Sequence, residues 1–199
     1  QGKYDEAEPL CRRSLAIDEK LYGPDHPEVA TDLNNWAELL RAQGKYAEAE
    51  PLYARATEIW EKALGLEHPL VATALNNRAA LLRAQGKYDE AEPLHFRAIA
   101  IGEKALGPEH PNLAVWLNNR AGLLSICSSA SSCTRRDISP FAFYFVIQGK
   151  YDEADPLYAR VLQILAATVG EEHPNYAAAL NNRAALLRAQ GKYDEAEPL

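Results

Sequence analysis

Apolar residues recur along this chain at the spacing of an α-helix. In residues 69–84 the apolar positions lie four, four and three residues apart, at Val71, Leu75, Ala79 and Leu82. After Gly86 a second stripe follows, made of Tyr88, Ala91, Leu94, Ala98 and Ile101. Such spacing puts the apolar side chains on one face of a helix, and proline at the start with glycine after the end is typical of helix boundaries. The pattern predicts two amphipathic helices joined by a tight Gln-Gly-Lys turn.

The same helix pair is repeated along the chain. The decapeptide QGKYDEAEPL begins at Gln1, Gln85 and Gln190, and variants that differ in one residue begin at Gln43 and Gln148. The copies are 42, 42, 63 and 42 residues apart. A fixed period of this length is typical of stacked repeats, so we expect an all-α solenoid of tandem antiparallel helix pairs. The predicted first helices lie near 28–42, 70–84, 112–124 and 175–189, and the predicted second helices near 4–21, 46–63, 88–105 and 151–168.

The repeats divide the chain into three parts. Residues 1–124 hold a partial unit, two full units and a further first helix, and residues 148–199 continue the array with a truncated last unit. Its final stretch from Tyr193 is too short to hold a helix by itself. Both ends of the chain fall inside the repeated decapeptide, so we expect this sequence to be part of a longer array. Between these parts lie residues 125–147, where 21 extra residues interrupt the period.

Short motifs inside each repeat resemble a known family. Gly-Lys-Tyr-x-Glu-Ala occurs at 44–49, 86–91 and 149–154, and an aromatic or similar residue stands four positions after the alanine, at Tyr53, His95 and Tyr158. The period alone also fits HEAT-type helices, but these motifs resemble the tetratricopeptide repeat. Leu-Asn-Asn in the first helix, Ala-Glu-Pro-Leu in the second and the Gly-x-x-His-Pro connector are similar to the repeat domain of kinesin light chains.

The resemblance implies a fold and a function. Tetratricopeptide arrays form right-handed superhelices, and the resemblance implies a non-catalytic adaptor that binds extended peptides in a concave groove. The implied partners are proteins or peptides, including cargo or motor proteins, and the implied cargo signal is a tryptophan flanked by acidic residues. The chain carries no heptad segment of the sort that light chains use to join a motor heavy chain.

The same resemblance implies which residues line the groove, since first helices line it in the family. The matching positions are the asparagines Asn34, Asn76, Asn118 and Asn181 and, two turns further along the same face, the arginines Arg41, Arg83 and Arg188. Residues seven apart share one side of a helix, and arginine suits carboxylate capture. Two alternatives stay open: the asparagines form a hydrogen-bonded spine between helices, and the arginines lie on a solvated face. For the second asparagine of each pair, such as Asn77, we expect a structural role.

Other repeated residues have structural interpretations. Arginine follows the asparagine pair at Arg78, Arg120 and Arg183, with Trp36 in the second copy, where the family usually has an apolar residue. A buried arginine must reach water or a carboxylate, and the acidic turn of a second helix offers one. Histidine precedes the helix-start proline at His26, His68, His110 and His173. We expect these histidines to cap helices and not to bind metal, since they lie one repeat apart. His95 replaces a tyrosine and is predicted to be a core residue.

Composition narrows the function classes further. The formal net charge is −7 and the basic residues do not cluster, which argues against nucleic acid and anionic membrane as partners. The longest apolar run is seven residues, Phe141–Ile147, too short to span a bilayer. No phosphate-binding loop, nucleophile elbow or zinc motif occurs, so we expect neither an enzyme nor a cofactor. The three cysteines, Cys11, Cys127 and Cys133, lack paired spacing and suit free thiols in the cytoplasm.

The interrupting segment has three interpretations. Residues 125–147 are rich in serine in the first half and apolar in the second, and they interrupt the position of a tight turn, where a surface loop is tolerated. The segment is a disordered loop that is functional, a neutral insertion, or an intron read through as coding sequence, since 21 residues correspond to a whole number of codons.

Two further functions remain open beside the adaptor. The array could be the ligand-sensing part of a larger signalling ATPase, or a purely structural array that associates with its own copies. The sequence does not identify a ligand.

Overall fold

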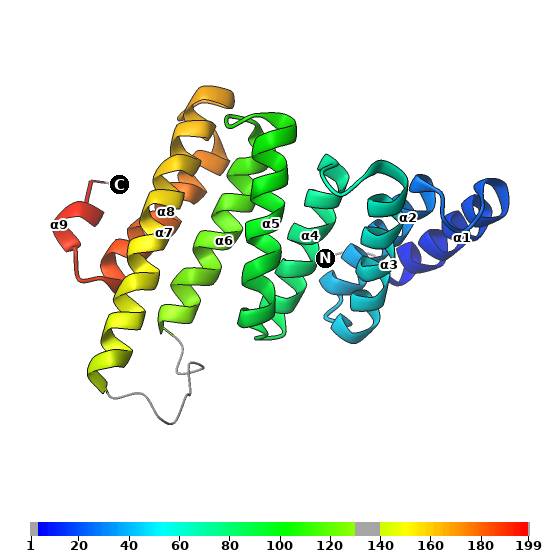
Figure 1. Cartoon of the computed structure of the whole chain (residues 1–199). Helices are drawn as coiled ribbons and strands as arrows, with labels where there is room; N and C mark the ends of the chain where they lie inside the picture. The colour runs from blue at the N-terminus through cyan, green and yellow to red at the C-terminus, as the bar shows by residue number, and fades with distance from the viewer. Residues whose placement is uncertain (1–3, 130–139, 199) are drawn as a thin grey trace. The chain divides into compact units, whose positions relative to one another are not determined.

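The computed structural model describes residues 4–129 and 140–198, and within them helices joined by short turns are the only regular secondary structure, without strands (Figure 1). The helices are α1 (Tyr4–Tyr22), α2 (Pro27–Ala42), α3 (Tyr46–Leu64), α4 (Pro69–Ala84), α5 (Tyr88–Leu106), α6 (Pro111–Ser129), α7 (Pro140–Thr168), α8 (Pro174–Ala189) and α9 (Tyr193–Ala196). The predicted all-α class is confirmed. Apart from the end of α6 and the start of α7, the predicted bounds of the eight long helices are correct to within one residue.

The chain forms two compact units, Gln1–Ala105 and Leu106–Leu199. In the first unit α1 packs on α2, α2 on α3, and α3 on α4. In the second unit α6 packs on α7, α7 on α8, and α8 on α9. The helices in these pairs therefore pack mainly on their neighbours in sequence, as expected of stacked helix pairs. None of the described helices is long and apolar enough to cross a bilayer.

Both units bury the same set of repeat positions. The first cluster consists of Ala37, Leu40, Ala49, Tyr53 and Leu81, and the second contains their counterparts Ala121, Leu124, Ala154, Tyr158 and Leu186, together with Tyr151. In each cluster a small alanine of the second helix lies beside a large aromatic ring, so that backbones approach closely while the ring fills the space between helices. His95 occupies the aromatic position in α5 and is fully buried, which confirms it as a core residue.

Histidine caps the start of each first helix, as the sequence predicted. In α4 the Nδ1 atom of His68 accepts a hydrogen bond of 3.2 Å from the backbone N–H of Leu70, and Pro69 occupies the first helical position. His26, His110 and His173 make the same bond at 3.1–3.2 Å. An acceptor at this position satisfies one of the backbone N–H groups that the first turn leaves unpaired.

Glycine ends the first helices of the regular repeats. Gly86 has a φ of 76°, its N–H bonds to the carbonyl of Arg83, and the N–H of Lys87 returns to the carbonyl of Leu82 at 2.9 Å. These bonds resemble the common left-handed termination of a helix, which glycine adopts without steric cost. The turn recurs at Gly44 and Gly191.

The interrupting segment is more helical than the sequence predicted. The expected first helix 112–124 continues to Ser129, and the expected second helix 151–168 begins at Pro140. Residues 125–129 and 140–147 of the predicted loop are therefore helical, and 130–139 lie outside the described residues. Gln148-Gly149-Lys150, predicted as a tight turn, lies inside α7. The reason is local: Pro140 suits a first helical position, and the residues after it contain no helix breaker before Gly149.

The last helix, α9, is a single turn. The sequence predicted that residues 193–199 would be too short to hold a helix alone, and the structure shows four helical residues that pack on α8. Packing on α8 stabilises this single turn, which would not be stable as an isolated helix.

Replacing His68 by alanine should lower the free energy of unfolding by about 1 kcal/mol, because the N–H of Leu70 loses its acceptor. His68→Asn should retain most of the stability, since an asparagine side chain accepts the same bond. Urea denaturation followed by circular dichroism measures both variants. Equal stability of the wild type and His68→Ala would show that the cap contributes nothing.

Candidate functional site

The asparagines predicted to face a ligand differ in exposure. Asn34 of α2 and Asn118 of α6 are half-buried, Asn76 of α4 is buried with 4% of its surface exposed, and Asn181 of α8 is exposed. The four copies therefore do not present equal surfaces, although each asparagine belongs to the same Leu-Asn-Asn motif. A direct ligand contact at Asn76 would require its neighbours to move.

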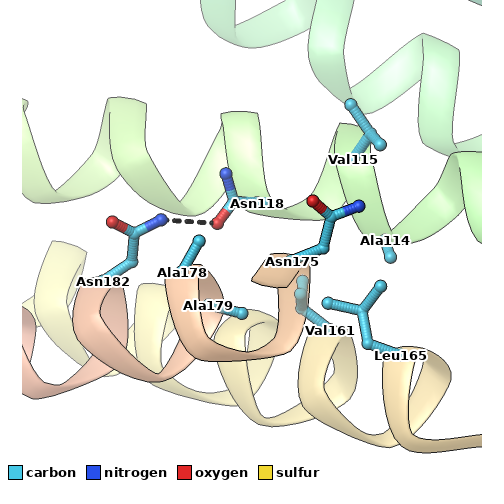
Figure 2. A pocket seen from close by; sticks show the side chains of 9 residues that line it. All are labelled: Ala114, Val115, Asn118, Val161, Leu165, Asn175, Ala178, Ala179 and Asn182. Atoms are coloured by element: carbon cyan, nitrogen blue, oxygen red, sulfur yellow. Dashed lines mark hydrogen bonds between the residues drawn. The ribbon is translucent and has the colours of Figure 1, made fainter. Parts of the chain in front are cut away.

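A hydrogen bond between asparagines joins adjacent first helices in each unit. The Nδ2 group of Asn77 donates to Oδ1 of Asn34 at 3.2 Å, and Asn182 donates to Oδ1 of Asn118 at 3.0 Å (Figure 2). The second asparagine of one repeat thus holds the first asparagine of the preceding first helix, which confirms the structural role expected of Asn77. These bonds favour the spine interpretation for Asn34 and Asn118, and their contact with a ligand remains a prediction.

Arg41 is held by an acidic residue one turn earlier in α2. Its Nη2 and Nε groups donate to Glu38 at 2.9 Å and 3.3 Å, and the buried Tyr53 hydroxyl donates to the same carboxylate. The bonds to Glu38 raise the pKa of Arg41. Burial, and then the bond to Glu38, raise the pKa of Tyr53, so its phenol stays protonated. The charge of Arg41 is therefore compensated within the repeat.

Arg83 and Arg188 have different surroundings. Alanine occupies the position that Glu38 occupies in α2, at Ala80 in α4 and Ala185 in α8. Arg83 is half-buried and Arg188 is exposed, and the described residues form no ion pair with either. The difference between Arg41 and the other two arginines is visible in the sequence, because Glu38 has no counterpart in the other copies. The resemblance to the family did not indicate it.

The arginines that follow the asparagine pair find carboxylates in the second helices. Arg183 bonds to Asp155 at 2.8 Å, and Arg78 lies 4.0 Å from Glu50, the residue at the same place in its repeat. The expectation that an inward arginine would reach the acidic turn of a second helix is confirmed for these two.

An apolar pocket of about 200 Å³ lies between α6 and α8, with α7 beneath it (Figure 2). Its walls are made by Ala114, Val115 and Asn118 of α6, Asn175, Ala178, Ala179 and Asn182 of α8, and Val161 and Leu165 of α7. Neither charged nor titratable side chains line it. The pocket therefore offers apolar surface together with amide groups, and it was not predicted from the sequence.

The described residues contain no group of three or more histidine, cysteine, aspartate or glutamate side chains able to hold a metal ion. Cys11 is a free thiol. Among the described residues the first helices carry amides, arginines and apolar side chains.

A family model for the tetratricopeptide repeat matches residues 1–62, 30–104, 70–126 and 141–199. The chain belongs to the tetratricopeptide repeat family. Comparison with curated proteins gives no match.

Solved structures with similar folds include kinesin-light-chain-like proteins, as the sequence predicted. A Podospora anserina protein described as a kinesin light chain with nearly identical repeats is 26% identical, with a TM-score of 0.73, over 99% of this chain and 83% of that one. A variant of that protein gives a TM-score of 0.74 at the same identity and coverage. The BtubC (BKLC) protein of P. vanneervenii is 22% identical with a TM-score of 0.77, over 99% of this chain and 70% of that chain, and shows the fold alone.

A double-mutant cycle on Asn34 and Asn77 should reveal a coupling of about 0.5–1.5 kcal/mol, the usual net contribution of one hydrogen bond. Each single alanine variant should destabilise the repeats by a similar amount, and the second substitution should then cost little. Chemical denaturation of the four proteins measures the cycle. Additive effects would show that the two amides do not stabilise each other.

Proposed function

We propose that this chain is a non-catalytic adaptor that binds extended protein segments along the surface of its first helices. Membership of the tetratricopeptide repeat family supports a scaffold for protein–protein interaction. One observation supports the proposal that extended segments bind along the first helices. Arg83 and Arg188 lie on first helices and have no ion-pair partner among the described residues. An arginine in this state can bind a carboxylate of a ligand without first breaking a bond to its own chain.

The asparagines add a second kind of contact. An asparagine side chain has two donors and an acceptor oxygen with two lone pairs, so Asn118 and Asn182 keep bonding capacity beyond the one bond that joins them. A peptide backbone in extended form offers matching carbonyl and N–H groups. Amide contacts of this kind fix the path of a peptide without depending on its side chains, which suits an adaptor for extended segments.

The expected affinity is moderate. An extended ligand must lose conformational freedom when it docks, and this cost offsets much of the gain from contacts. We therefore infer micromolar binding for a short peptide. The kinesin-light-chain-like neighbours make cargo peptides with a tryptophan flanked by acidic residues the first ligands to test, and a cytoplasmic location remains part of the proposal.

The double substitution Arg83→Ala and Arg188→Ala should weaken binding of a labelled acidic tryptophan peptide about 3- to 10-fold, because charge-assisted contacts to the ligand are lost. The matched control is Arg41→Ala, which should change the affinity less than about 2-fold, since Glu38 already neutralises Arg41. Fluorescence anisotropy at two salt concentrations measures all three proteins. If Arg41→Ala weakens binding more than the double variant does, the assignment of Arg83 and Arg188 is wrong.

A further inference from the structure

The pocket between α6 and α8 exists where this repeat departs from the corresponding repeat of the first unit. Leu165 in α7 is the eighteenth residue from the glutamine that opens its repeat, Gln148, and Trp60 in α3 is the eighteenth from Gln43. At the fourteenth position α7 has Val161 and α3 has Ala56. The asparagine bond above these positions is the same in both units. The floor therefore differs by Leu165 in place of Trp60 and Val161 in place of Ala56, and the walls differ by Val115, Asn175 and Ala178 in place of Thr31, Leu70 and Thr73. The replacement of an indole by an aliphatic side chain is the largest single reduction in size among these differences.

In the first unit Trp60 is packed into the repeat. Its side chain is 2% exposed, and its Nε1–H donates to the carbonyl of Pro27 at the start of α2, at 3.2 Å. Leu165 is also buried, with 7% exposed, but a leucine side chain is much smaller than an indole and has no donor to direct toward the start of α6. The smaller side chain leaves space beside Ala114 and Val115, and these residues form one wall of the pocket (Figure 2).

We propose that this pocket takes one neutral, apolar side chain of about phenyl size from an extended peptide, and that the size of the residue at position 165 decides whether the pocket exists. The inference rests on the proposed function and names the ligand chemistry for one part of that surface. The volume of about 200 Å³ exceeds the roughly 150 Å³ of an apolar protein cavity known to accept benzene.

The lining favours a neutral side chain. A carboxylate or an ammonium group against the apolar floor of this pocket would lose part of its hydration, and no charged side chain lines the walls to compensate it. The amides of Asn118, Asn175 and Asn182 lie around the apolar floor, where they can bond to the peptide groups on either side of the inserted side chain. This arrangement favours an apolar residue with its two flanking peptide bonds over a charged motif.

The test is an NMR titration of the full chain with two blocked peptides, acetyl-Gly-Ser-Phe-Ser-Gly-amide and the same peptide with aspartate at the centre. The phenylalanine peptide should shift the methyl signals of Val115, Val161 and Leu165 and the side-chain amide signals of Asn118 and Asn182. Its affinity should be unchanged between low and high salt, because no ion pair forms. The aspartate peptide should bind at least about tenfold more weakly, since its carboxylate would be desolvated without a partner.

Two variants locate the site. Val115→Asp places a charge on the pocket wall at a residue that is already 54% exposed, and Val169→Asp is the matched control, since Val169 is 41% exposed and does not line the pocket. Val115→Asp should weaken binding of the phenylalanine peptide at least about tenfold by the same desolvation argument, and Val169→Asp should not. Leu165→Trp should fill the pocket and abolish binding while keeping the helical circular dichroism spectrum.

The outcomes separate this inference from the proposed function. If the acidic tryptophan peptide binds but the phenylalanine peptide does not, or binds equally well to Val115→Asp and Leu165→Trp, the pocket assignment is overturned and the adaptor proposal stands. If neither peptide binds a folded chain, both are overturned. Binding of the phenylalanine peptide that both pocket variants abolish supports the pocket.

Discussion

The structure depends on the burial of one repeat face against the next, which the same few positions accomplish in both units. An alanine at 49 or 154 lets the second helix approach its neighbours, and the tyrosine at 53 or 158 fills the space that remains. A solenoid has no central core, so each repeat is stable only through such contacts with the adjoining ones. The hydrogen bonds between asparagines and the pairs between arginine and carboxylate are added to this apolar contact at fixed positions. The asparagine bonds join one first helix to the next, and the arginine–carboxylate pairs join a first helix to the second helix that precedes it.

The exposed charged residues contribute less to the stability of the fold than this apolar contact does. Lys104 pairs with Glu67 and Lys62 with Asp25 across 37 residues, and all four side chains are largely exposed. Exposed pairs of this kind contribute between zero and about 1 kcal/mol each and weaken in salt. The repeated spacing of these pairs therefore reflects the repeated sequence more than a requirement for stability. By contrast, Arg183 and Asp155 are mostly buried, so removal of one partner alone would leave a charge without compensation.

The sequence predicts the fold well because its helix signals are local and repeated. Proline, histidine and glycine stand at the helix boundaries, and the bounds of α2 to α5 follow from them to within one residue. The same local signal fails at Gln148-Gly149-Lys150, which lies inside α7. Glycine permits a left-handed turn but does not require one, so the preceding helical residues decide. The pocket was not predictable either, because it results from the relative sizes of Trp60 and Leu165 and from how three helices meet, which no repeat motif expresses.

The positions where the copies differ give each repeat a surface of its own. A frame of nearly identical repeats presents the same backbone several times, and a single substitution then changes one local surface without altering the fold. Glu38 neutralises Arg41, whereas alanine at the same position leaves Arg83 and Arg188 without that partner. Trp60 fills the space beneath one pair of first helices, and Leu165 leaves a pocket beneath another. Under the proposed function, such differences between repeats would determine which part of a ligand each repeat binds.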